Sequence, residues 1–354
     1  MGRTAAEPPV GPMILVTGAG GYIGSRLVPR LLADGHRVRA TFTNVSRANS
    51  LWWHEDPQVE TVQMDVFDSA SVDAAVEGVA TAYYLIHGLA DPEFERLDRL
   101  AAQTFAEAAT RAGVERVIYL SGLVPMLPAS ELSPHLRSRL EVEQVLTTRA
   151  PSTVTLRAAM VIGGGSTSLE IMRQLSNRLP AQPLPTWMNS RLQPISVVDA
   201  LEALVGALDP RVPSRWYDIG GPTAIGYGML LWEFGRAAGL RRRPRVFVPF
   251  LPEPLVADLA GALVGAPGST VEALIDSLSH DMVCADDDFV TELLPPGWQL
   301  MPLRESLQRA IVDSDSDCDQ RDPMQRMPHD AAWTASSDGM VRGLTRGLIR
   351  LTTR

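Results

Sequence analysis

The chain contains no lysine, and it has two cysteines among its 354 residues. Its 32 basic residues are therefore all arginines, which excludes mechanisms that need a lysine amine, such as Schiff-base formation or a phosphate-loop lysine. Cys284 and Cys318 are too few for a disulfide framework or for a metal site built from thiolates. The six histidines do not have the spacing of metal ligands, so we predict no metal site.

Long apolar runs are also missing. No stretch reaches the roughly 18 unbroken apolar residues of a membrane span, and the first ten residues lack the apolar core of a secretory signal. The net charge of −9 argues against binding to nucleic acid or to an anionic membrane surface. A hydrophobic content of 45% with 21% charged residues is typical of globular proteins. We therefore expect a soluble, cytoplasmic protein without a transmembrane segment or a nucleic-acid partner.

The most informative stretch of the chain runs from Met13 to Asp34. It begins with the apolar run Met13 to Val16, which has the length of a buried strand, and continues through a glycine-rich turn into a helix-length segment. Gly18 allows the tight turn, and Gly21 lets backbone N–H groups approach a pyrophosphate. Gly24 lets the helix pack closely against the strand.

This pattern predicts a dinucleotide site, because phosphates are stabilised by unpaired N–H groups and by the dipole at a helix N-terminus. A purely structural glycine turn is the alternative. The predicted cofactor-binding residues of this loop are Thr17, Gly18, Gly20, Gly21, Tyr22, Ile23 and Gly24.

Further strand-length segments alternate with helix-length segments over about 120 residues. The expected strands after the first are 36–42, 59–64, 81–86 and 114–120. This alternation predicts a Rossmann-type, doubly wound α/β fold with a parallel sheet and a smaller, mostly helical C-terminal substrate-side part. Ligands of such sheets bind at the carboxyl ends of the strands, so His87 and Ser121 should converge with the glycine loop.

The residues that follow the second and third strands bear on the choice of cofactor. Thr43 and Arg47 follow the second strand, and no carboxylate occurs there until Glu55, which favours NADP(H) over NAD(H) because an arginine can accommodate the 2′-phosphate. Asp65 and Val66 follow the third strand, where an acidic residue can reach the adenine amino group. The alternatives are a solvated loop arginine and an acidic turn residue.

Composition divides the chain into an N-terminal extension, one NAD(P)-binding unit and a tail. From Asp313 acidic residues alternate with small polar ones, which favours a disordered tail; Cys318 and Met324 occupy key positions of a calcium loop and argue against one. The predicted boundaries are 1–10 for the extension, 11–312 for the unit (nucleotide part about 11–165 and 194–219, substrate-side part about 166–193 and 220–312) and 313–354 for the tail.

Several of these motifs together resemble the extended and atypical short-chain dehydrogenase/reductase superfamily. They are the loop from Thr17 to Gly24, Asp65-Val66, the strand ending at Ser121, and the segment from Gln193 to Asp199. The segments 132–139 and 157–163 are similar to blocks that recur in its NmrA-like bacterial NAD(P)-binding group. The resemblance covers about residues 13 to 312.

Catalytically active members of this superfamily use a Tyr-x-x-x-Lys pair on the helix after the fifth strand. Here that helix offers His135 and Arg139 instead, which lie four residues apart and therefore share one face. The resemblance makes both residues candidates for catalysis, with His135 as a proton shuttle near pH 7 and Arg139 holding ribose or phosphate oxygens. The alternative is that His135 is simply a first-turn helix residue and Arg139 a surface or phosphate-side contact.

Two functions remain open on the sequence alone. One is an NADP(H)-dependent oxidoreductase that acts on a small carbonyl-type substrate without the Tyr-Lys pair. The other is a non-catalytic NAD(P)H-binding redox sensor or assembly protein with a protein partner. A sugar-nucleotide epimerase shares the fold but depends most on the missing tyrosine.

Overall fold

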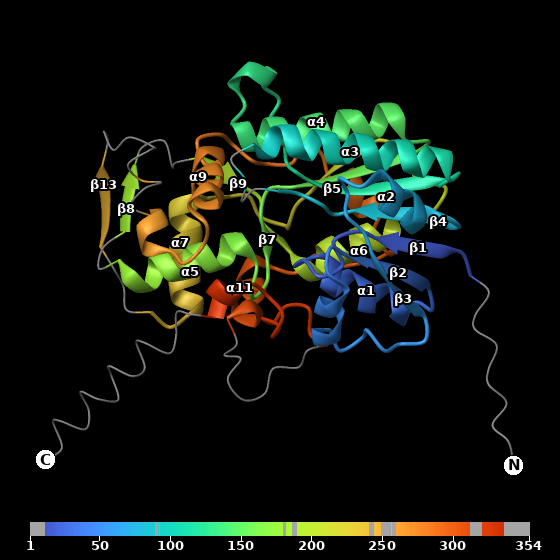
Figure 1. Ribbon diagram of the computed structural model, residues 1–354. Coiled ribbons are helices and arrows are strands. Elements are labelled where there is room, and N and C mark those ends of the chain that lie inside the picture. Colours follow the sequence, from blue (N-terminus) through green and yellow to red (C-terminus); the bar gives the residue numbers. More distant parts are fainter. Residues whose placement is uncertain are drawn as a thin grey trace, which may run out of the picture.

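The computed structural model describes residues 11–88, 91, 93–179, 182–185, 190–240, 244–248, 256, 260–311 and 321–335 (Figure 1). The predicted N-terminal extension, residues 1–10, lies outside this part of the chain. No helix within the described residues is both long and apolar enough to cross a membrane.

A seven-stranded parallel sheet forms the centre of the molecule. The strands are β1 (Met13–Val16), β2 (Arg37–Phe42), β3 (Val59–Gln63), β4 (Val79–Tyr84), β5 (Arg116–Gly122), β6 (Thr153–Ala158) and β11 (Trp216–Ile219). Their order across the sheet is β11-β6-β5-β4-β1-β2-β3, and every neighbouring pair is parallel. The strand order reverses between β1 and β4, which is the point where a doubly wound sheet opens a ligand crevice at its carboxyl edge.

Helices cover both faces of this sheet. The helices α3 (Phe94–Arg111) and α4 (Pro134–Arg149) pack side by side on one face, and α1 (Gly24–Ala33) and α6 (Val197–Gly206) lie on the other (Figure 1). The helix α2 (Ser69–Val76) contributes to the same core as α3. The predicted doubly wound α/β architecture is therefore confirmed.

Strand β1 contains only apolar residues because both of its faces are buried in a hydrophobic core. Ile14 and Val16 belong to the core beneath α1 and α6, whereas Met13 and Leu15 belong to the core beneath α2, α3 and α4. Alternate side chains of a strand point to opposite faces, and here both faces are covered. Leu15 and Val16 are accordingly fully buried.

The smaller part of the molecule is mostly helical, as expected. Its helices are α5 (Thr167–Arg178), α7 (Tyr227–Ala237), α9 (Gly268–Ser277), α10 (Asp288–Glu292) and α11 (Leu303–Ala310). Pairs of short strands connect them: β7 (Val161–Ile162) with β10 (Ile195–Ser196), β9 (Arg191–Leu192) with β12 (Ile225–Gly226), and β8 (Gln182–Pro185) with β13 (Arg245–Val248).

The four strands expected after the first are present, each within two residues of its expected bounds. The fourth strand begins at Val79 and ends at Tyr84, two residues before the expected end. The sixth leaves the main sheet after Ala158, and β7 then pairs with β10. The Ala158 carbonyl accepts a hydrogen bond from the Leu123 N–H, and the Met160 carbonyl accepts one from the Ile195 N–H, so the chain switches partners there.

Residues 321–335 contradict the expectation of a disordered tail from residue 313 onward. This stretch, which we call the C-terminal segment, packs against α1 and α5 and ends in a short 3₁₀ helix, Ala332–Ala335. Met324 and Met327 are buried in it, and Asp330 is 8% exposed. The remainder of the predicted tail, residues 313–320 and 336–354, lies outside the described residues.

Candidate functional site

A cavity of about 470 Å³ opens at the carboxyl edge of the sheet, where β1, β4 and β5 end. Its walls contain the glycine loop together with the predicted residues from the neighbouring strands and from α4. The predicted site residues that line it are Gly18, Gly21, Tyr22, Ile23, Gly24, His87, Ser121, His135 and Arg139. The expected convergence of three separate segments on one crevice is therefore present.

The glycine loop is shaped by close backbone contacts. Gly18 has a φ of +61°, a conformation that glycine adopts at little cost, and the Gly21 N–H donates to its carbonyl oxygen at 2.9 Å. A Cβ atom on Gly24 would overlap the same Gly18 carbonyl and lie 2.8 Å from the Ala19 Cα. The spacing of these glycines is thus required by the tight passage from β1 into α1.

Helix α1 begins directly at this loop. Its N-cap residue is Ile23, whose apolar side chain cannot accept a hydrogen bond from the first turn. The Ser25 and Arg26 N–H groups already donate to backbone carbonyl oxygens. The features left for a phosphate are the positive end of the helix dipole and the N–H groups of Tyr22, Ile23 and Gly24, for which the described residues hold no backbone acceptor.

Two predicted loop residues lie outside the cavity wall and have structural contacts. The Thr17 hydroxyl donates to the Tyr83 carbonyl and accepts from the Leu85 N–H, both at 2.9 Å, so it ties β1 to β4. Gly20 faces the Phe42 ring: an added Cβ would lie 3.1 Å from a ring carbon, so the ring would have to shift by a few tenths of an ångström to admit it.

The four residues predicted for the adenosine half follow β2 and β3 and do not line the cavity. Thr43 and Arg47 are exposed, the latter within the 3₁₀ helix η1 (Val45–Ser50). Asp65 is exposed and its carboxylate accepts a hydrogen bond from the Phe67 N–H, as a turn residue does, while Val66 is buried. Their roles toward a cofactor stay predictions.

His135 and Arg139 lie one helical turn apart on the buried face of α4, with 8% and 7% of their surface exposed. Burial and the positive charge of Arg139 lower the pKa of His135 to about 3. The Nδ1 atom of His135 is buried and has no hydrogen-bond partner among the described residues. This pKa is well below that of a histidine that titrates near neutral pH, and the catalytic role of His135 stays a prediction.

The positive charge of Arg139 shifts the pKa values of neighbouring groups at this end of the cavity. It lowers the pKa of His87, an exposed residue of the cavity wall, well below its usual value. It also opposes the burial that raises the pKa of Asp98, a residue that sequence reasoning missed. Asp98 is 5% exposed and accepts hydrogen bonds from the Gly88 N–H at 2.8 Å and the Ser138 hydroxyl at 3.2 Å.

Two hydroxyl groups at the end of β5 are buried without a partner among the described residues. They belong to Tyr119 and Ser121, and burial raises the pKa of Tyr119 while the nearby Arg139 lowers it. Of these two residues only Ser121 lines the cavity, whereas the Tyr119 ring lies in the core beneath α3. Buried polar groups are normally hydrogen-bonded, so the Ser121 hydroxyl and the His135 Nδ1, beside the Arg139 charge, indicate a polar ligand at this end of the cavity.

The opposite wall comes from parts of the chain that no motif indicated. It includes Ser166, Thr167 and Ser168 at the start of α5, Pro267 and Thr270 at the start of α9, Leu274, and Trp333 of the C-terminal segment. Trp333 was assigned to the predicted tail, and nothing in its local sequence distinguishes it from a tail residue.

Comparisons with known proteins agree with this geometry. Residues 18–177 match a protein family described as NAD(P)H-binding. The ceramide reductase of Caulobacter vibrioides is 30% identical over 258 residues, which cover 72% of this chain and 78% of that protein. A mitochondrial NADH dehydrogenase [ubiquinone] 1 alpha subcomplex subunit 9 of Arabidopsis thaliana is 27% identical over 60% of this chain and 54% of its own length.

Among solved structures, the triphenylmethane reductase of Citrobacter sp. complexed with NADP(H) has the same fold, with a TM-score of 0.65 and 21% identity over 84% of this chain and 99% of that chain. The family match, the ceramide reductase and the parallel sheet with its glycine loop lead to one assignment. The chain belongs to the NAD(P)H-binding proteins of the extended short-chain dehydrogenase/reductase superfamily.

Proposed function

We propose that the protein is an NADP(H)-dependent oxidoreductase that acts on a small carbonyl-type substrate without a Tyr-Lys pair. The observation that carries this proposal is the single cavity that joins the phosphate-binding start of α1 to the buried His135 and Arg139. The glycine loop would hold the diphosphate, and the Ser121 hydroxyl and Arg139 would lie at the nicotinamide end. The bound nicotinamide supplies the hydride chemistry.

Arg139 is the residue best suited to stabilise a negative charge that develops on a substrate oxygen. Its burial strengthens the electrostatic effect of its guanidinium relative to that of an exposed arginine. His135 remains neutral, so it would orient the oxygen by a hydrogen bond rather than deliver a proton from an imidazolium ion. The proton that completes a carbonyl reduction would then come from water.

The NADP(H) preference rests on the end of β2. Arg47 is exposed. Burial chiefly lowers the pKa of His329 in the C-terminal segment, and the charge of Arg47 lowers it further, so Arg47 lies near this segment. An exposed guanidinium at this place would pair with the 2′-phosphate of NADP(H) and gain nothing from NAD(H).

A non-catalytic NAD(P)H-binding role is the second candidate. It is favoured by the low pKa of His135 and by the absence of lysine, which together leave the α4 pair without a group that titrates near pH 7. The similarity to a mitochondrial NADH dehydrogenase subunit points in the same direction. This role predicts stoichiometric binding of one nucleotide without its consumption, and a protein partner.

The two candidates are separated by NADPH consumption with a panel of ketones and quinones. We expect multiple turnovers for the wild type, and a loss of at least a hundredfold in kcat for Arg139→Gln. The control is Arg149→Gln on the same helix, because Arg149 forms an exposed ion pair with Glu107 far from the cavity. Tight binding without turnover of any substrate would favour the non-catalytic role, and no binding at all would contradict both.

A further inference from the structure

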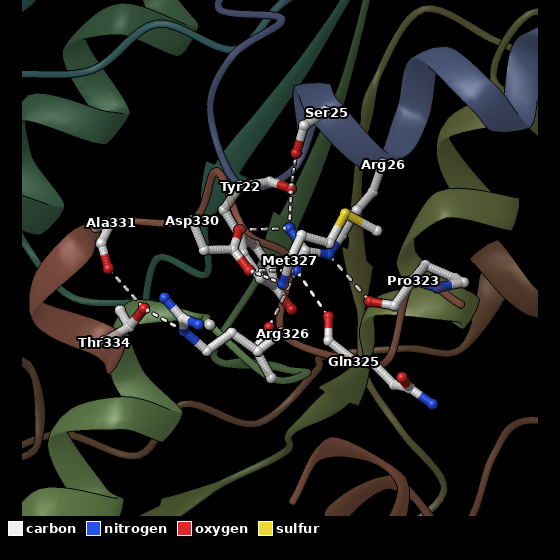
Figure 2. Close-up of polar contacts among 12 residues, drawn as sticks. Tyr22, Ser25, Arg26, Pro323, Gln325, Arg326, Met327, Asp330, Ala331 and Thr334 are labelled. Atoms are coloured by element: carbon white, nitrogen blue, oxygen red, sulfur yellow. Dashed lines mark hydrogen bonds and ion pairs between the residues drawn. The ribbon is translucent and has the colours of Figure 1, made fainter. Parts of the chain in front are cut away.

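The C-terminal segment is joined to the glycine loop through one buried side chain, Arg26. Arg26 lies on the first turn of α1, immediately after the loop, and is 1% exposed although it carries a full charge. Its guanidinium forms a two-bond ion pair with the Asp330 carboxylate, at 2.9 Å and 2.8 Å, across 304 residues of sequence (Figure 2). Side-chain exposure in this pair is 0% and 2%.

The remaining donors of Arg26 connect three pieces of backbone. They bond to the carbonyl oxygens of Tyr22 in the glycine loop, of Gly164 after β7, and of Pro323 and Gln325 in the C-terminal segment, each at 3.0 Å. The guanidinium also stacks over the Tyr22 ring, 3.9 Å from its centroid. Arg26 therefore fixes the loop, the end of β7 and the C-terminal segment relative to one another.

The Asp330 carboxylate holds the charge of Arg26 in place. Its Oδ2 atom also accepts a hydrogen bond from the Met327 N–H at 2.7 Å, which closes the C-terminal segment on itself (Figure 2). Gly165 has a φ of +84°, and an added Cβ there would lie 2.6 Å from the Asp330 Cγ, so the loop after β7 leaves space for this carboxylate.

The same segment reaches the cavity. Trp333 lines it opposite the glycine loop, and its carbonyl accepts a hydrogen bond from Gln174 of α5 at 3.1 Å. The Thr334 carbonyl accepts another from Arg173 at 2.6 Å. The segment is thus fastened both to α1 and to α5, on either side of the place where Trp333 meets the cavity.

We propose that the C-terminal segment contributes Trp333 to the wall of the dinucleotide site, and that Asp330, acting through Arg26, is a positioning residue for the loop that binds the diphosphate. This inference rests on the proposed nucleotide binding and adds a requirement to it. The loop N–H groups bind phosphate only when their backbone is correctly placed, and the Tyr22 carbonyl is held by the same guanidinium that Asp330 neutralises. Loss of the Asp330 charge should therefore weaken nucleotide binding at a distance.

The test is a calorimetric titration of the full-length protein with NADPH, at a temperature where circular dichroism shows each variant to be folded. We expect Asp330→Asn to raise the Kd at least tenfold. The matched control is Glu202→Gln, since Glu202 pairs with Arg30 one turn further along the same helix and has no contact with the segment; its Kd should stay within twofold of the wild type. A merely structural role of Asp330 would lower the melting temperature and leave the Kd of the folded protein unchanged, which would overturn the proposal.

These titrations distinguish a failure of the proposed nucleotide binding from a failure of the role proposed for the C-terminal segment. If the wild type binds no NADPH, the proposed function fails. If the wild type binds NADPH and Asp330→Asn binds it equally well, only the inference about the segment fails.

If Asp330→Asn does not fold, amide hydrogen exchange of the wild type with and without NADPH tests the same proposal. We expect NADPH to slow amide exchange in residues 321–335 as well as in the glycine loop, while exchange in α2, away from the cavity, is unchanged. Slower exchange in the loop without any change in residues 321–335 would contradict the proposal.

Discussion

The glycine loop, residues 17–24, and the C-terminal segment, residues 321–335, meet at the first turn of α1 and line one cavity, yet they are specified in different ways. The loop is determined by backbone geometry within eight consecutive residues: Gly18 makes the turn, and Gly24 makes room for the Gly18 carbonyl. The segment is held by a side-chain ion pair that spans 304 residues.

This difference explains why the glycine loop can be recognised in the sequence and the C-terminal segment cannot. A glycine requirement depends on near neighbours, so its spacing can be recognised in a sequence. The partner of a buried charge depends on the whole fold, and Asp330 looks like any acidic residue in a polar tail. The following predictions test this contrast, beginning with the largest expected effect.

Removal of the Asp330 carboxylate should have the largest effect on stability. Asp330→Ala would leave the Arg26 charge buried without its counterion, which typically costs about 3–5 kcal/mol of unfolding free energy. The comparison is Asp73→Ala, because Asp73 and Arg111 form a pair about half exposed and such pairs contribute about 1 kcal/mol or less. Urea unfolding of both variants measures the difference; equal losses would show that the segment does not depend on its buried pair.

A methyl group at Gly24 should displace the backbone of the glycine loop. Gly24→Ala places a Cβ against the Gly18 carbonyl, so the loop must shift, and overpacking of this kind typically costs about 1–3 kcal/mol. We expect the Kd for NADPH to rise at least tenfold. Gly235→Ala in α7 is the control, since nothing lies within 4 Å of an added Cβ there. Unchanged binding by Gly24→Ala would contradict the role given to the loop.

The neutral state of His135 predicts a pH effect on stability. The unfolded chain protonates this histidine below about pH 6.5, whereas the folded protein keeps it neutral until the pH approaches about 3. The unfolded state then binds more protons, so stability falls as the pH falls through this window, by up to about 1.4 kcal/mol per pH unit.

Denaturant unfolding at pH 7, 6, 5 and 4 measures that slope. His135→Gln should remove part of the slope, because glutamine takes up no proton. Identical slopes for the variant and the wild type would show that His135 is protonated in the folded protein, and would restore it as a candidate proton shuttle.

The smallest expected effect concerns the cofactor preference. Arg47→Ala should weaken NADPH binding by about fivefold to tenfold, the contribution of roughly 1 kcal/mol expected from an exposed charge pair, and leave NADH binding unchanged. Arg37→Ala, at the opposite end of β2, should change neither affinity. An equal loss for both nucleotides would show that Arg47 does not distinguish them.

Much of the fold and part of the site could be predicted from the sequence, because they follow from local patterns. The apolar run of β1, the glycine spacing and the alternation of strands and helices place His87, Ser121, His135 and Arg139 around one cavity. What escaped prediction depends on distant partners or on burial. Asp98 is a polar residue on the buried side of α3, and its role follows from the Gly88 N–H and Ser138 that it contacts.

The pKa of His135 could not be predicted for the same reason. Its sequence position indicates the face of α4 that it shares with Arg139, but the pKa depends on how completely the fold removes both residues from water. The end of the sixth strand likewise depends on β10, a segment more than thirty residues later that takes over pairing with β7.

The central claim is that the backbone at the start of α1 binds the diphosphate of a nicotinamide dinucleotide. It is tested most directly by titrating the wild type and Gly21→Asp with NADPH, NADP, NADH and NAD in a calorimeter. Gly21 is exposed in the cavity wall, so the new carboxylate would lie where the phosphates are expected and repel them. We predict one tight site for NADPH in the wild type and none in Gly21→Asp; a wild type that binds none of the four nucleotides, or a variant that binds them equally well, would contradict the account.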